Sequence, residues 1–70
     1  MKILVTERFG GKKQYWVQLP TGATVADLLK NLEGKDPEAY MVVVDGKNRL
    51  PHHPLQDNDH VELLLWMAGG

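Results

Sequence analysis

Apolar and polar residues alternate with a period of two in the first part of the chain. Residues 2–8 (KILVTER) and 14–19 (QYWVQL) are rich in β-branched and aromatic residues, and a glycine-containing segment, 9–13, separates them. This pattern predicts a β-hairpin. The period places Leu4 and Trp16 on one face of the hairpin. The other face, expected to point into the core, carries Ile3, Val5, Tyr15, Val17 and Leu19.

The spacing becomes helical after Pro20. Thr24 followed by Asp27 three positions later resembles a capping box and predicts a helix N-terminus. Apolar residues at positions i, i+3, i+4 and i+7 then form one stripe: Val25, Leu28, Leu29 and Leu32. Gly34 suits the end of the helix. Burying the stripe would contribute roughly 6–12 kcal/mol before entropy is subtracted, so the stripe is read as core.

Two further apolar runs complete the pattern. Residues 40–45 (YMVVVD) predict a short strand, and the segment 45–48 (DGKN) predicts the turn that ends it. Residues 49–60 are expected to be irregular, and 61–66 (VELLLW) to form the last strand. The inward-facing residues of this strand are expected to be Val61, Leu63 and Leu65. The order predicts an α+β fold with one helix packed on one face of a sheet.

The opposite face of this sheet is expected to carry several large apolar residues: Leu4, Trp16, Leu64 and Trp66. No second layer is predicted to cover them, and an open apolar face often marks a binding surface. Packing against a loop, or contact with a second copy of the chain, would account for Leu64 and Trp66 equally simply. Burial of Trp16 would follow if the hairpin register slipped by one residue.

Composition narrows the classes of function. The 70 residues, 43% of them hydrophobic, support one compact domain with a thin core. With 8 Lys and Arg against 9 Asp and Glu, the chain has no basic footprint for nucleic acid. No cysteine is present, so disulfides, thiolate nucleophiles and cysteine-based zinc sites are excluded. Without a signal pattern or a long apolar run, a cytoplasmic protein with no membrane association is expected.

No set of residues predicts a catalytic or metal site. His52 and His53 are adjacent and would point opposite ways in extended chain, and no zinc-ligand spacing includes His60. Asp57 and Asp59 lie in a QDND run that favours a turn over an acid–base pair. We therefore expect no bound metal and no enzymatic activity of the chain's own.

The whole pattern resembles the ThiS/MoaD family of sulfur-carrier proteins. The resemblance rests on the order of elements, the segment 53–65 (HPLQDNDHVELLL) and above all the final Ala68-Gly69-Gly70. It implies a β-grasp, ubiquitin-like fold with four to five strands in a mixed sheet, the first and last strands parallel at its centre and a helix across one face. Residues 1–66 would form this domain, and 67–70 a mobile tail that carries the chemistry.

The terminal carboxylate would have to be activated before it could react with a nucleophile. An α-carboxyl group has a pKa of about 3.3–3.7, so Gly70 would end in an anion that resists nucleophiles. Formation of an acyl-adenylate from ATP would activate it, and attack by a sulfur donor would leave a thiocarboxylate. The segment 10–14 (GGKKQ) lacks the P-loop spacing, with Lys12 and Lys13 expected in a solvated hairpin loop. The ATP site, with its Mg²⁺, is therefore expected in a partner, which the resemblance identifies as an E1-like adenylating enzyme.

The tail is short and unhindered. Residues 67–70, fully extended, would reach roughly 13–14 Å. Gly69 and Gly70 lack Cβ atoms and would fit a narrow channel. Ordering the tail would cost roughly 4–8 kcal/mol, so docking contacts are needed elsewhere. The expected docking residues are Leu4, Trp16, Leu64, Trp66 and Met67. A frayed end, or a chain that continues past residue 70, is the simpler alternative for this segment.

Several functions fit this resemblance. The short length of the chain favours the carrier that supplies sulfur for the thiazole of thiamine. Such a carrier would receive sulfur from a desulfurase or rhodanese-type donor and pass it to thiazole synthase. The small subunit of molybdopterin synthase, acting with the large subunit, also fits. So does a ubiquitin-like modifier joined to lysines through Gly70. A β-grasp interaction module without terminal chemistry is the alternative from a different class.

Overall fold

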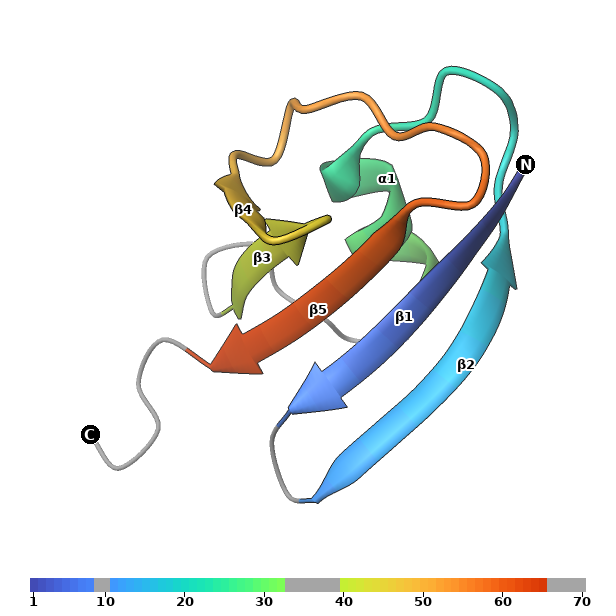
Figure 1. The fold of residues 1–70 in the computed structure, drawn as a ribbon. Coiled ribbons are helices and arrows are strands. Elements are labelled where there is room, and N and C mark those ends of the chain that lie inside the picture. The colour runs from blue at the N-terminus through green and yellow to red at the C-terminus, as the bar shows by residue number, and fades with distance from the viewer. Residues whose placement is uncertain (9–10, 33–39, 66–70) are drawn as a thin grey trace.

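The computed structural model describes residues 1–8, 11–32 and 40–65 and contains one mixed sheet with a helix on one face (Figure 1). The strands are β1 (Lys2–Arg8), β2 (Lys12–Gln18), β3 (Tyr40–Val44), β4 (Lys47–Arg49) and β5 (His60–Leu65). The helix, α1, spans Val25–Asn31. In Figure 1, α1 lies behind the sheet, across its inner strands.

The sheet has the order β2-β1-β5-β3-β4, so the first and last strands pair at its centre. The β1–β5 pair is parallel, and the other pairs are antiparallel. A parallel pair needs a long crossover connection, which α1 and the β3–β4 hairpin provide here. The β-grasp arrangement implied by the family resemblance is therefore confirmed.

The predicted capping box starts α1. The Thr24 side chain accepts a hydrogen bond from the Asp27 amide, and the Asp27 carboxylate accepts one from the Thr24 amide at 2.9 Å. The helix ends with Leu32 as its C-cap, and the predicted stop at Gly34 lies outside the described residues.

The segment that follows β4 closes the start of α1. The amide of Val25 donates to the carbonyl of His53 at 3.0 Å, and that of Ala26 donates to Pro51 at 2.8 Å. The amides of the first helical turn, which have no partner within a helix, are thereby satisfied. This ties the long segment 50–59 to the helix, although the sequence pattern predicts only irregular structure there.

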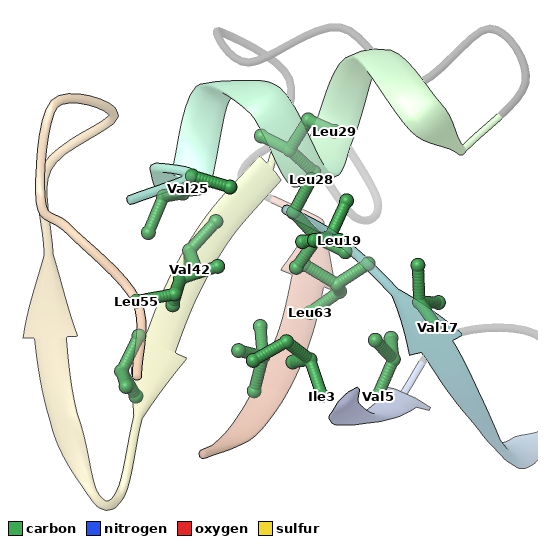
Figure 2. Packing of buried hydrophobic residues seen from close by; sticks show 13 residues of the cluster. Ile3, Val5, Val17, Leu19, Val25, Leu28, Leu29, Val42, Leu55 and Leu63 are labelled. Atoms are coloured by element: carbon green, nitrogen blue, oxygen red, sulfur yellow. The ribbon is translucent and has the colours of Figure 1, made fainter. Parts of the chain in front are cut away.

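The core lies between α1 and the inner face of the sheet, and Figure 2 shows its side chains meeting there. Ile3, Val5, Leu28, Leu63 and Val61 are fully buried. The predicted inward faces of β1 and β2 are confirmed, with Tyr15 partly buried at the edge of the core. The helical stripe is also confirmed, with Leu32 partly buried.

Leu65 departs from the predicted inward set, because it remains 37% exposed. It is the last residue of β5 and pairs with Tyr40, the first residue of β3, at the end of the ladder. The two-residue alternation reaches this position, but Leu63 is the last residue of β5 that belongs to the buried core.

Two predicted loops are wrong in their bounds. Lys12 and Lys13 belong to β2 and pair with Arg8 and Glu7, rather than lying in the hairpin loop. The opposite charges of Lys13 and Glu7 stabilise this cross-strand pair, despite the low strand propensity of lysine.

The second correction concerns residues 45–49. Asp45 and Gly46 form a tight turn with φ of 50° and 86°, so the chain reverses in two residues and continues as β4. Both residues in the left-handed region fit the Asp-Gly turn of a two-residue hairpin. Lys47 and Asn48 therefore lie in a strand instead of the turn.

Candidate functional site

The sheet face that points away from α1 is the candidate site, and we call it the open face. Among the described residues, no helix or strand covers it (Figure 1). The register places these residues on it: Lys2, Leu4, Thr6, Arg8, Lys12, Gln14, Trp16, Gln18, Met41, Val43, Asn48, His60, Glu62 and Leu64.

One apolar area of the open face lies on β1 and β2. Leu4 and Trp16 are cross-strand partners, and Trp16 is 55% exposed. The Lys2 Nζ atom lies 5.2 Å from the centroid of the Trp16 ring, within cation–π range. We call Lys2, Leu4 and Trp16 the Trp16 patch. The predicted register and the outward position of Trp16 are thus confirmed.

A second apolar area lies on β3 and β5. Leu64 pairs with Met41, and Val43 lies on the same face one pair further along β3. All three are partly exposed. We call these residues the Leu64 patch, and it adjoins the end of β5, from which the chain continues toward Gly70.

A polar strip separates the two patches, which the sequence pattern did not predict. Thr6 is a buried residue, 1% exposed, and its hydroxyl group lies 2.8 Å from Nε2 of His60. The Gln14 side-chain amide donates to the same hydroxyl at 2.9 Å. Beside them, Arg8 and Glu62 form an ion pair. The open face is therefore two apolar patches divided by hydrogen-bonded polar residues, instead of one continuous apolar surface.

Tyr15 occupies the opposite side of the same strands. Its hydroxyl donates to the Glu7 carboxylate, and Lys13 Nζ lies 5.9 Å from its ring centroid. Burial raises the pKa of the Tyr15 hydroxyl, and the hydrogen bond to Glu7 raises it further. This cluster anchors the end of the β1–β2 hairpin and adds no reactive group to the open face.

The predicted tail and part of the predicted docking set lie outside the described residues. These are Trp66, Met67, Ala68, Gly69 and Gly70. The structure places the remaining docking candidates, Leu4, Trp16 and Leu64, on the open face. It brings Leu4 and Trp16 together and separates them from Leu64 by the polar strip.

The other candidates occupy structural positions. Asp57 accepts from the Lys2 amide at 2.8 Å, and Asp59 accepts from the Gln56 amide at 2.8 Å. The predicted turn in the QDND run is confirmed, with Asn58 at φ 69°. Across residues 1–8, 11–32 and 40–65, no cluster of metal-ligating side chains is found. In the same ranges, no helix has the length and apolar character needed to cross a membrane.

Comparison with known proteins agrees with this geometry. The model of the ThiS family matches residues 7–70. No curated protein matched the chain significantly.

Solved structures share the fold. SAMP1 from Haloferax volcanii superposes with a TM-score of 0.80 at 18% identity, with all of both chains covered. A putative molybdopterin converting factor, subunit 1, from Pyrococcus furiosus gives 0.76 at 20% identity, covering 91% of this chain and 95% of that one. A ubiquitin-like protein from Caldiarchaeum subterraneum gives 0.67 at 18% identity, covering 99% and 100%. At these identities the likeness establishes the ubiquitin-like β-grasp fold.

Proposed function

Because the chain belongs to the ThiS family of ubiquitin-fold sulfur carriers or modifiers, we propose that it is a sulfur carrier loaded at Gly70. The observation that carries the proposal is the extent of the family match, which runs from residue 7, near the end of β1, through Gly69 and Gly70. The proposal requires Gly70 to be the last residue of the mature protein.

The chemistry has three steps, all performed by partners. The Gly70 carboxylate attacks the α-phosphorus of ATP and releases pyrophosphate, which gives an acyl-adenylate. The terminal sulfur of a persulfide on a desulfurase or rhodanese-type donor then attacks the carbonyl carbon and AMP leaves, which gives an acyl disulfide. A second thiol of the partner, acting as the reductant, attacks the donor sulfur of that S–S bond, so that a thiocarboxylate remains on Gly70 and a disulfide on the partner. An E1-like enzyme supplies the ATP and Mg²⁺ site. The chain itself acts as substrate and carrier and not as an enzyme.

The fold supports this division of labour. β5 is a central strand, hydrogen-bonded to β1 and β3, and ends at Leu65. The residues that follow could span at most roughly 16–18 Å when fully extended, which is enough to enter another protein's active site. Gly69 and Gly70 offer no side chain to obstruct a narrow channel.

We propose that the open face docks on the activating enzyme. The Leu64 patch adjoins the base of the segment that leads to Gly70, and the Trp16 patch provides a second apolar contact. The polar strip between them would meet polar groups of the partner. Such contacts fix the orientation of the docked chain more than they strengthen its binding. A docked carrier must later dissociate, so two small patches suit it better than one large one.

We propose that thiazole synthase, in thiamine synthesis, accepts the sulfur, because the chain is short. The molybdopterin pathway is the alternative for a sulfur carrier. Lysine modification through Gly70 and a pure interaction module are competing outcomes of the mass measurement below.

Intact mass spectrometry tests the terminal chemistry. The chain is incubated with an E1-like enzyme, ATP, Mg²⁺ and a sulfur donor, and exchange of one terminal oxygen for sulfur is expected. Deleting Gly70, or appending one alanine after it, should abolish loading without changing the circular dichroism spectrum. Loading that persists in both variants would overturn the proposal. Adducts with other proteins would instead identify a modifier, and an unchanged mass under all conditions an interaction module.

Calorimetric titration with the activating enzyme tests docking. Trp16→Ala removes a side chain that is 55% exposed, so the contact could contribute up to about 3 kcal/mol, roughly a hundredfold in Kd. Leu50→Ala is the matched control, because Leu50 is 65% exposed but lies outside the open face. Equal effects of the two substitutions would contradict docking through the open face.

A further inference from the structure

One edge of the sheet is a long strand that nothing in the described fold protects. β2 lies at this edge and, among the described strands, pairs with β1 alone (Figure 1). It has seven residues and no proline, and its register with β1 runs without a bulge. Short length, charge, proline and bulges are the common ways of protecting an edge strand. The other edge strand, β4, has only three residues, two of them charged, so the two edges differ.

The register shows which backbone groups of β2 point outward. Met1 and Leu19 exchange two backbone hydrogen bonds, at 2.7 and 2.9 Å. Bonded and non-bonded pairs alternate in an antiparallel ladder, so the odd-numbered residues of β2 are the ones that bond to β1. In agreement, the amide of Leu4 donates to Asp59, on the side of β5. The backbone groups of the even-numbered residues therefore face the open edge: Lys12, Gln14, Trp16 and Gln18.

This edge has a defined centre. Gly11, with φ of 98°, bounds it at one end, and Pro20, which has no amide hydrogen, bounds it at the other. Between these limits the outward-facing residues are placed symmetrically about Tyr15. A second copy of β2, antiparallel and related by a two-fold axis at Tyr15, would use all of them. Each pair of outward-facing residues could then exchange two hydrogen bonds.

The two lysines at one end of β2 favour this arrangement over others. In a parallel pairing in register, each lysine would lie opposite its own copy, and like charges directly opposite destabilise a sheet. In the antiparallel pairing about Tyr15, Lys12 lies opposite Gln18 of the second copy, and Lys13 lies opposite Val17 of the second copy. The lysines of the two copies are then at opposite ends of the interface.

Both faces of the paired strands would gain aromatic contacts. On the open face, Trp16 is 55% exposed and would lie diagonally beside Trp16 of the second copy, at roughly 7–8 Å, within reach of aromatic rings. On the helix side, the two copies of Tyr15 would form a cross-strand pair at the axis. The Tyr15 hydroxyl donates to Glu7 on β1, which draws the ring away from the edge and leaves the backbone accessible.

We propose that two copies of the chain associate through β2, antiparallel and centred on Tyr15, to form one continuous sheet. Both copies use the same edge, so the association closes at a dimer. A net charge of −1 on each chain opposes it only weakly.

The dimer would cover one apolar patch and leave the other free. β1 separates β5 from the β2 edge, so the Leu64 patch stays accessible. The Trp16 patch, in contrast, lies at the junction of the two copies. Self-association would therefore compete with the docking of Trp16 on an activating enzyme, although the dimer itself does not depend on the proposed function.

Sedimentation equilibrium of the full chain alone, at physiological ionic strength, tests the association. A monomer–dimer equilibrium is expected between micromolar and millimolar protein. Gln18→Glu would face Lys12 of the second copy twice in each dimer and should lower the dissociation constant by roughly two- to thirtyfold, and Gln18→Lys should raise it by a similar factor. Asn48→Asp and Asn48→Lys are the matched controls, because Asn48 is an exposed amide residue of the other edge strand. They should change the constant by less than about twofold.

Amide hydrogen exchange, followed by nuclear magnetic resonance, tests the register. The amides of Tyr15 and Val17 bond to β1 and should be protected at every protein concentration. Those of Gln14 and Trp16 should exchange rapidly in dilute protein and become protected as the dimer forms. This measurement uses the wild-type chain, so it decides the question even if a charge variant fails to fold.

Four results would overturn the proposal. A monomer at millimolar concentration would leave the edge to a strand of another protein. A dimer with unprotected Gln14 and Trp16 amides would place the contact elsewhere, as would equal dissociation constants for Gln18→Glu and Gln18→Lys. Protection of those two amides in the dilute monomer would show that the chain covers its own edge.

Discussion

The hydrogen bonds of Thr6 offer a direct measure of what the polar strip contributes to folding. Thr6→Val keeps the branched shape of the side chain and removes only the hydroxyl group. Thr6 is 1% exposed, and its hydroxyl contacts Nε2 of His60 at 2.8 Å and Nε2 of Gln14 at 2.9 Å. The substitution therefore leaves two nitrogen atoms without their partner.

The two losses differ in size. Gln14 is exposed, so its amide can turn to water at little cost. His60 is only partly exposed, and its ring would lose a partner that water replaces poorly. With a net value of about 0.5–1.5 kcal/mol for each hydrogen bond, we expect Thr6→Val to lower the free energy of unfolding by about 1–2 kcal/mol. For a domain of this length, that corresponds to a decrease in Tm of roughly 4–16 °C.

Urea denaturation and scanning calorimetry check this value. Thr21→Val is the matched control, because Thr21 is exposed and the same substitution there should change stability by less than about 0.5 kcal/mol. A double-mutant cycle with Gln14→Ala then isolates the Thr6–Gln14 pair. If Thr6→Val were as stable as the wild type, the hydroxyl would be replaceable by a methyl group and the reasoning about the strip would be wrong.

Three further substitutions test the core, the hairpin and the helix cap. Leu63→Ala, at a fully buried site of β5, should lower the free energy of unfolding by about 2–5 kcal/mol in urea titrations, and a loss below 1 kcal/mol would contradict its central position. Burial and the hydrogen bond to Glu7 raise the pKa of Tyr15, so its contribution to stability should be fully present below about pH 10. Above that pH the unfolded chain releases the proton first, and the free energy of unfolding should fall. In Tyr15→Phe this alkaline decline, followed by circular dichroism, should be smaller. Hydrogen bonds from Thr24 lower the pKa of Asp27. The contribution of Asp27 to stability should therefore be present above about pH 3.9 and be lost as the pH falls through the pKa of the folded state. Asp27→Asn should reduce this acid-induced loss of stability, and an unchanged dependence on acid pH would argue against the capping box.

The sequence pattern predicted the features that depend on local periodicity. The two-residue alternation placed Leu4 and Trp16 outside and Val17 inside, and the spacing of Thr24 and Asp27 located the start of the helix. These signals are strong because one buried face fixes the register of each element.

The features that it missed depend on contacts across the fold. The strand β4 has the sequence KNR, with no apolar residue, and exists because the Asp45–Gly46 turn folds it back on β3. The polar strip joins Thr6 to His60, which are 54 positions apart, so no local pattern could reveal it. Asp-Gly between an apolar run and a polar one is a known hairpin signal and could have identified β4.

The central position of β5 also determines how the protein responds to mechanical load. The strand is bonded along one edge to β1 and along the other to β3. Tension transmitted along the chain beyond Leu65 runs nearly parallel to both ladders and loads many bonds together in shear. An edge strand such as β2 is bonded to one neighbour alone, so the same pull would be shared by fewer bonds. A partner that grips the residues after Leu65 could therefore pull on them, or release them, without unravelling the sheet behind them.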